Sequence, residues 1–266
     1  MSATSSFPSN PLPLAGAAVV LTRPAGDSAA LAARVRSYGG VAVILPGSSL
    51  RATDDVDAAS TAMRASATID DWIFASPAAV RFAFRLLPDL RIPRRARVFA
   101  PGTGTCRALA RHGIAAIAPV ERQDSEGLLA LPALSRVRGR RIALICAPGG
   151  RGTIAAELGR RRARVKPVPV YRRAPPRLTR RHFEALARAP APLITLLSSG
   201  EALRNLCAAL PPQLLLRLRR QALIVSSARL LAAARAHGFD TIMVARSASP
   251  RDLLAAGVAA LARHRL

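Results

Sequence analysis

The chain has 266 residues, which is more than most single domains contain, and half of them are hydrophobic, enough for packed cores. Its apolar stretches, such as Ala15–Leu21, are far shorter than the roughly 20 residues of a membrane-spanning helix, so no membrane span is expected. Forty Lys and Arg against 15 Asp and Glu give a formal charge of +25, which attracts anionic partners such as nucleic acids or polycarboxylated metabolites.

The first residues, 1–14, are rich in Ser and Pro, and no basic residue precedes Arg23. They lack the charged start and apolar middle of a secretory signal, so we predict a disordered tail and a cytoplasmic protein. The three cysteines, Cys106, Cys146 and Cys207, share no close spacing and predict neither a disulfide framework nor a zinc site.

Beyond the tail, apolar runs alternate with amphipathic segments, which is typical of βα units around parallel sheets and predicts an α/β fold. The predicted strands are Ala17–Leu21, Val41–Leu45, Asp71–Phe74, Val98–Ala100, Ala115–Ala118, Ile142–Ile145, Val165–Val168, Leu193–Leu197, Leu223–Val225 and Thr241–Val244. Predicted helices between them include Asp27–Tyr38, Pro77–Leu87, Thr105–His112, Thr153–Arg162, Glu201–Leu210 and Ala228–Ala236. Gly39, Gly113 and Gly238 each follow a predicted helix, where a left-handed C-cap favours glycine.

An internal repeat relates the two halves of the chain at a spacing of about 123 residues. The matching segments are Gly16–Leu21 with Gly139–Leu144, Val43–Pro46 with Lys166–Pro169, and Trp72–Pro77 with Ile194–Ser199. The repeat predicts that the two halves share one structural plan.

Ligands of parallel sheets bind beyond the carboxyl ends of the strands, where loops lead into helices. In this chain those loops are Thr22–Asp27, Ala75–Ala78, Pro101–Thr105, Ala147–Thr153, Ser198–Glu201 and Ser226–Arg229. They consist largely of Ser, Thr, Gly and Pro, so their N–H groups and hydroxyls face the positive ends of helix dipoles and suit an extended polyanion. Alternatively, each Ser or Thr only caps its own helix.

The sequence shows no familiar catalytic constellation, metal site or cofactor motif. His112 and His237 precede helix-ending glycines, and His182 and His264 lie in charged segments without a neighbouring ligand pattern. The glycine-rich loops at Gly102 and Gly149 lack both the phosphate-binding Lys-Ser/Thr ending and the complete dinucleotide-binding spacing. The run Asp54, Asp55, Asp57 is interpreted as a polar linker or a helix start.

Tyr171 is one of two tyrosines and directly follows a predicted strand, beside Arg172 and Arg173. A tyrosine at such a strand end often belongs to the core with its hydroxyl at the surface. The functional interpretation is a phenol that donates a hydrogen bond to a departing hydroxyl or to a carboxylate.

Several short segments, taken in order, resemble the uroporphyrinogen-III synthases. They are VVLTRP (Val19–Pro24), FASPAAV (Phe74–Val80), APGTGTCRAL (Ala100–Leu109), DSEGLL (Asp124–Leu129), VPVYRR (Val168–Arg173), LSSGEALRNL (Leu197–Leu206) and IVSSARLLAAARAHGF (Ile224–Phe239). The resemblance covers nearly the whole chain. Departures from the family pattern include Ala75, Ala78 and Pro101, and Arg151 stands as a shifted substitute for an arginine that the family has earlier in that loop.

The resemblance implies two flavodoxin-like α/β domains joined by a two-segment linker, with the substrate in the cleft between them. One domain would consist of residues 15–47 and 172–266, and an inserted domain of residues 48–171. The implied substrate-binding residues are Thr22, Arg23, Ser76, Pro77, Gly102, Thr103, Thr105, Arg151, Ser198, Ser199, Ser226 and Ser227. Tyr171 is the implied catalytic residue.

The implied activity is that of a cofactor-independent lyase of heme biosynthesis, which closes hydroxymethylbilane to uroporphyrinogen III with loss of water and inversion of ring D. The implied protein is a cytoplasmic monomer that meets hydroxymethylbilane synthase transiently, if at all. A catalytically silent, two-lobed anion-binding homologue is the alternative. Nucleic-acid binding is not expected, because only 4% of the residues are aromatic and no basic helix carries interleaved stacking residues.

Overall fold

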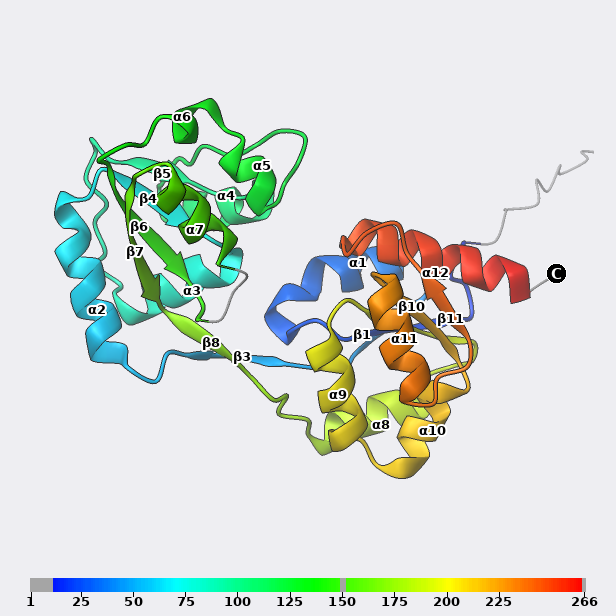
Figure 1. Cartoon of the computed structure of the whole chain (residues 1–266). Coiled ribbons are helices and arrows are strands. Elements are labelled where there is room, and N and C mark those ends of the chain that lie inside the picture. The colour runs from blue at the N-terminus through cyan, green and yellow to red at the C-terminus, as the bar shows by residue number, and fades with distance from the viewer. Residues whose placement is uncertain (1–11, 149–151, 265–266) are drawn as a thin grey trace, which may run out of the picture. The chain divides into compact units, whose positions relative to one another are not determined.

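The computed structural model describes residues 12–148 and 152–264, which form two separate units (Figure 1). Unit 1 consists of Met1–Ser49 and Ala174–Leu266, and unit 2 consists of Leu50–Arg173. The sequence placed the divisions after residues 47 and 171, each two residues before a division of the structure.

The expected tail over residues 1–14 falls largely outside the described residues, but its last part belongs to unit 1. Leu14 is fully buried, and its N–H donates to the carbonyl of Tyr38 at 2.9 Å. A Cβ atom on Gly40 would lie 2.8 Å from the Cβ atom of Leu14. Gly40 thus leaves room for the side chain of Leu14, which is part of the unit 1 core. The predicted end of the tail, at residue 14, is therefore too far along the chain.

Unit 1 contains a parallel sheet with the strand order β11-β10-β9-β1-β2. The strands are β1 (Ala18–Leu21), β2 (Val41–Ile44), β9 (Leu193–Leu197), β10 (Ala222–Val225) and β11 (Ile242–Val244). Numbered along the chain within the unit, this is the order 2-1-3-4-5 of flavodoxin-like folds. The predicted strands of unit 1 are therefore confirmed to within about one residue.

Helices cover both faces of the unit 1 sheet, as the successive apolar residues of its strands require. Leucines of α1 (Ala29–Ser37) and α12 (Pro250–His264) pack with Val19 and Leu21 on one face. On the other face, Val20 packs with α8 (Arg180–Arg188), α9 (Gly200–Ala209), α10 (Pro212–Arg219) and α11 (Ala228–Ala236). A short 3-10 helix, η1 (Ala25–Asp27), precedes α1.

Unit 2 contains a second parallel sheet, with the order β5-β4-β6-β7. Its strands are β4 (Asp71–Phe74), β5 (Arg97–Phe99), β6 (Arg141–Cys146) and β7 (Arg164–Pro169). The predicted strand Ala115–Ala118 is reduced to one bridge between Ile117 and Phe99 at the β5 edge. Ile117 remains 44% exposed, so too little of this segment is buried to hold a full strand.

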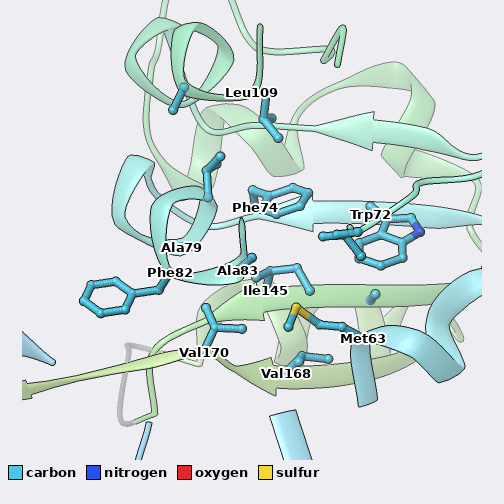
Figure 2. Packing of buried hydrophobic residues seen from close by; sticks show 14 of the residues in the cluster. Met63, Trp72, Phe74, Ala79, Phe82, Ala83, Leu109, Ile145, Val168 and Val170 are labelled. Carbon is cyan, nitrogen blue, oxygen red and sulfur yellow. The ribbon is translucent and has the colours of Figure 1, made fainter. Parts of the chain in front are cut away.

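Three helices cover each face of the unit 2 sheet, with side chains alternating between them along each strand. Trp72 and Phe74 of β4 pack with Met63 of α2 (Val56–Arg64), Phe82 of α3 (Pro77–Leu86) and Leu109 of α4 (Thr103–Ala110), as Figure 2 shows. On the opposite face, Ile73 packs with residues of α5 (Ser125–Leu129), α6 (Pro132–Ser135) and α7 (Thr153–Arg160). A 3-10 helix, η2 (Ala65–Thr68), follows α2.

Two strands that the sequence did not predict, β3 (Ser49–Ala52) and β8 (Tyr171–Ala174), pair where the chain passes between the units. The acidic run beyond β3 is a helix start, one of the two options left open, because Asp55 caps α2 by accepting from the N–H of Ala58 at 2.8 Å. Asp54 instead pairs with Arg172 at 2.7 Å.

The internal repeat explains the order of both sheets. The matched segments place β1 with β6, β2 with β7, and β4 with β9, and the strands that come next along the chain, β5 and β10, then correspond to each other. Replacing each strand of the order β5-β4-β6-β7 by its counterpart gives β10-β9-β1-β2, which is the order in unit 1. Each sheet therefore combines strands from both halves of the chain.

Candidate active site

The candidate residues of unit 2 follow the carboxyl ends of its parallel strands and therefore share one edge of its sheet. Ser76 and Pro77 come after β4, and the loop from Gly102 to Thr105 comes after β5. Tyr171 follows β7 and begins β8. Arg151, in the loop after β6, lies outside the described residues.

Ser76 and Tyr171 are brought into contact by this arrangement. Their hydroxyl oxygens lie 3.1 Å apart, although 95 residues separate them in the sequence. Ser76 is also the N-cap of α3, and its Oγ accepts from the N–H of Ala79 at 3.0 Å. The phenol of Tyr171 is therefore held, through Ser76, at the positive end of a helix dipole.

The ring of Tyr171 is fixed by an aromatic contact with α3. It stacks on Phe82 with ring centroids 5.4 Å apart and an interplanar angle of 16°. The guanidinium groups of Arg81 and Arg85 lie 5.6 and 5.4 Å from the Phe82 centroid, so the stack has cations beside it. The core interpretation of Tyr171 is confirmed, because the residue belongs to the core cluster, while its functional interpretation stays a prediction.

The loop after β5 is organised by Gln123, which the sequence gave no reason to single out. The N–H and hydroxyl of Thr103 donate to Gln123 Oε1 at 3.1 and 2.9 Å. A Cβ atom on Gly102 would lie 2.8 Å from the Gln123 Cβ atom, so glycine allows this close approach. Thr105 is only 2% exposed, and its N–H donates to the carbonyl of Gly102.

The candidate residues of unit 1 follow three adjacent strands at the corresponding edge of its sheet. Thr22 and Arg23 come after β1, Ser198 and Ser199 after β9, and Ser226 and Ser227 after β10. Register pairs Leu21 with Leu196 and Ile224 with Leu196, so these loops start side by side.

Most hydroxyls in these loops already have partners within the fold. Ser199 and Ser227 cap α9 and α11, as Ser76 caps α3, so the capping interpretation is confirmed for all three. Thr22 is 3% exposed and donates to the carbonyl of Leu196 at 2.7 Å. First-turn N–H groups, which lack intrahelical acceptors, are therefore the main donors left for an anion.

Three of the four histidines have structural roles. His112 stacks on Phe84 with centroids 3.7 Å apart, and His237 is the C-cap of α11. His182 forms a capping box with Thr179 at the start of α8. Among the described residues, no group of three or more His, Cys, Asp or Glu could hold a metal ion.

The cysteines are unsuited to nucleophilic catalysis. All three are free, and burial raises the pKa of Cys106, Cys146 and Cys207. A raised pKa keeps the side chain as a thiol, whereas the thiolate is the reactive form.

An ionic cluster at the opposite edge of the unit 2 sheet was missed by sequence reasoning. Asp71, fully buried at the start of β4, accepts from Arg97 Nε at 2.6 Å and Arg140 Nε at 2.5 Å, and from a second nitrogen of each. Burial acts to raise the pKa of Asp71, but hydrogen bonds and charges from both arginines outweigh it and lower the pKa. The only sequence signal was an Asp opening an apolar run.

Comparison with known proteins is consistent across sequence and structure. The family model described as uroporphyrinogen-III synthase HemD matches residues 29–255. The uroporphyrinogen-III synthase of Salmonella typhimurium is 34% identical over 253 residues, covering 90% of this chain and 98% of that protein. The Escherichia coli enzyme of the same name is 30% identical over 247 residues, with the same coverage.

Two solved structures share the fold at low sequence identity. The uroporphyrinogen-III synthetase of Helicobacter pylori has a TM-score of 0.58 at 13% identity, covering 91% of this chain and 98% of that chain. A mutant uroporphyrinogen III synthase of Thermus thermophilus has a TM-score of 0.54 at 21% identity, covering 93% and 99%. The family model over residues 29–255 and the relatives from Salmonella typhimurium and Escherichia coli show that the chain belongs to the uroporphyrinogen-III synthase family.

Proposed function

We propose that this protein performs the reaction of its family, closing hydroxymethylbilane to uroporphyrinogen III with loss of water and inversion of ring D. It is a lyase of heme biosynthesis, and neither the family match nor the named relatives support a catalytically silent alternative. The observation that carries the site assignment is the contact between Ser76 and Tyr171 at the start of α3.

Tyr171 assists departure of the substrate hydroxyl. Ser76 Oγ already accepts from the N–H of Ala79, so its own proton is free to be donated to the phenol oxygen. Tyr171 then keeps its proton for a hydrogen bond to the leaving oxygen as the C–O bond breaks. That bond stabilises the negative charge developing on the oxygen and favours formation of the cationic azafulvene.

The loops at the carboxyl ends of the strands bind the substrate carboxylates. The candidate residues are Thr22, Arg23, Pro77, Gly102, Thr103, Thr105, Arg151, Ser198, Ser199, Ser226 and Ser227, with Ser76 beside Tyr171. Because several of the hydroxyls cap helices, we assign most carboxylate contacts to first-turn N–H groups. The formal charge of +25 favours capture of a polycarboxylate.

Selection of the type III isomer needs no strong nucleophile. Held carboxylates fold the linear substrate so that the substituted carbon of its last pyrrole reaches the azafulvene. Orientation of this kind supplies several kcal/mol. We further propose that residues 15–47 with 172–266 form one domain and residues 48–171 the other, and that the protein is a cytoplasmic monomer that contacts hydroxymethylbilane synthase transiently. Among the described residues, no helix is both long and apolar enough to cross a membrane.

Product analysis tests the proposal. Purified protein is supplied with hydroxymethylbilane, the products are oxidised, and the porphyrin isomers are separated by chromatography. The type III isomer should dominate, whereas heat-denatured protein should give the type I isomer of unassisted closure. Type I product alone from native protein would contradict the proposed activity.

A further inference from the structure

A basic hollow lies at the amino ends of β6 and β7 in unit 2, and neither the family reaction nor the candidate site uses it. It has a volume of about 330 Å³ and is largely open to solvent. It is lined by Ala65, Thr68, Ile69, Arg141, Arg164, Val165 and Lys166. Because β4 to β7 are parallel, this edge of the sheet is opposite the edge that carries Ser76 and Tyr171.

Three cationic side chains share one face of these two strands. Arg141 pairs in register with Arg164, and Ala143 pairs with Lys166, so alternation places Arg141, Arg164 and Lys166 on the same face. Val168, two residues after Lys166, is buried on that face under the helices. Near the amino ends the face carries charges instead, and like charges on adjacent strands repel each other.

This repulsion is only partly relieved within the protein. Arg141 donates to the carbonyl of Thr68 and lies 3.8 Å from a carboxylate oxygen of Asp70. Across residues 12–148 and 152–264, neither Arg164 nor Lys166 forms an ion pair with an acidic side chain. Arg164 and Lys166 are thus exposed cations beside Arg141, and neither has a carboxylate partner among the described residues.

We infer that this hollow binds a small phosphorylated metabolite through its phosphate group. Arg164 offers a planar pair of N–H donors and Lys166 adds a compact charge, while Arg141, whose guanidinium donates to the carbonyl and the hydroxyl of Thr68, adds a third positive charge beside them. A phosphate dianion would relieve the repulsion among the three cations. The hollow is larger than a phosphate group, and Ala65 and Ile69 provide apolar surface for the organic part.

Lys166 is the only lysine in the chain, so it provides a direct test. Protein with ¹³C-labelled lysine is titrated with inorganic phosphate and with glucose 6-phosphate at constant ionic strength, and the Lys166 Hε–Cε signal is followed by NMR. Saturable shifts with both probes, at least as tight for the ester, are expected. Shifts that do not saturate, or that sodium chloride reproduces, would overturn the proposal.

Two variants locate the site. Arg164→Gln should weaken binding of both probes at least fivefold. The control Arg94→Gln removes the same charge from an exposed position in unit 2 outside the hollow, and it should change affinity less than twofold. Equal losses in the two variants would mean that phosphate follows the net charge of the surface and would refute the assigned site.

Discussion

The two units are built from equivalent strands in the same order, yet they differ at both edges of their sheets. At the carboxyl edge, Ser76 and Ser199 cap the helices that follow the corresponding strands β4 and β9, but the spacing of about 123 residues places Ser48 where unit 2 has Tyr171. At the amino edge, unit 2 buries an ionic cluster around Asp71, whereas in unit 1 Gln221 Oε1 accepts from the N–H of Leu193 at 3.0 Å. A shared plan therefore supplies capped helix N-termini at the carboxyl edge of both units, and unit 2 adds the phenol of Tyr171 and the buried Asp71.

The largest expected effect concerns the buried charge. Asp71→Asn should lower the free energy of unfolding of unit 2 by about 3–5 kcal/mol, because Arg97 and Arg140 would lose a buried counter-charge. Trp72 is the single tryptophan, lies in the unit 2 core and is fully buried, so its fluorescence in a urea titration reports this unit.

A substitution at the corresponding edge of unit 1 provides the comparison for Asp71→Asn. Gln221→Ala removes the neutral counterpart in unit 1 and should cost only about 1–3 kcal/mol by leaving the N–H of buried Leu193 unpaired. That loss should appear in circular dichroism while the Trp72 transition stays in place. Equal shifts of the fluorescence transition in both variants would contradict the assignment of the two edges to separate units.

Removal of the phenol should affect catalysis rather than stability. Tyr171→Phe should slow turnover roughly a hundredfold, the scale of positioned proton donors, while the Trp72 unfolding transition stays close to that of the parent protein. Tyr38→Phe, at the other tyrosine in the chain, is the control and should keep the full rate. An unchanged rate in Tyr171→Phe would remove this residue from the mechanism.

Acid should destabilise unit 2 through Asp71. Its pKa is lower in the folded than in the unfolded chain, so its contribution is complete above the unfolded value of about 4 and is lost as the pH falls through the folded value. Trp72-detected stability should therefore decline in acid, and this part of the decline should disappear in Asp71→Asn. Persistence of the full decline in the variant would mean that other groups cause it.

Unit 1 has a different acid response. A hydrogen bond from Ser247 lowers the pKa of Asp252, with further contributions from Ser249 and nearby arginines. Because that carboxylate is at the surface, solvent screening leaves it with little influence on folding. The comparison of the two units is therefore cleanest when the Trp72 signal alone is followed below pH 4.

The smallest expected effect concerns the two N-cap serines, Ser76 and Ser199. Ser76→Ala and Ser199→Ala should each cost about 1 kcal/mol of stability, because each leaves a first-turn N–H of its helix without its acceptor. Only Ser76→Ala should also reduce kcat, since it removes the partner of the Tyr171 hydroxyl. Ser199→Ala should act on KM alone, and a matching fall of kcat in both variants would show that capping explains the loss.

Much of the fold could be predicted from the sequence because strand periodicity is local. Asp71–Phe74 and Leu193–Leu197 match their predicted bounds, and positive φ angles at Gly39, Gly113 and Gly238 confirm the predicted caps. The linker strands β3 and β8 were not predicted, since the alternation of Leu50 and Ala52 with polar residues in β3 is only four residues long, and Arg172 and Arg173 interrupt the apolar pattern of β8. Ala115–Ala118 was overpredicted because an apolar run does not reveal whether a second strand flanks it.

The candidate site was predicted only in part. Loop position made Ser76 a candidate, the strand-end position made Tyr171 one, and the family resemblance supported both, but their contact depends on sheet order, which no local pattern encodes. Gln123 and the arginines around Asp71 escaped notice for the same reason: each meets its partner across at least 20 residues. In a chain so rich in arginine, composition does not distinguish a buried guanidinium from a solvated one.

The mixed origin of the two sheets has a consequence for the ancestry of the chain. The pairings of β4 with β6 and of β1 with β9 both join the first repeat to the second. This connectivity is what strand exchange between two copies of a half-length polypeptide, followed by fusion of their genes, would leave behind. Cleavage of the chain between the repeats would thus separate paired strands in both sheets, and neither fragment would contain a complete unit.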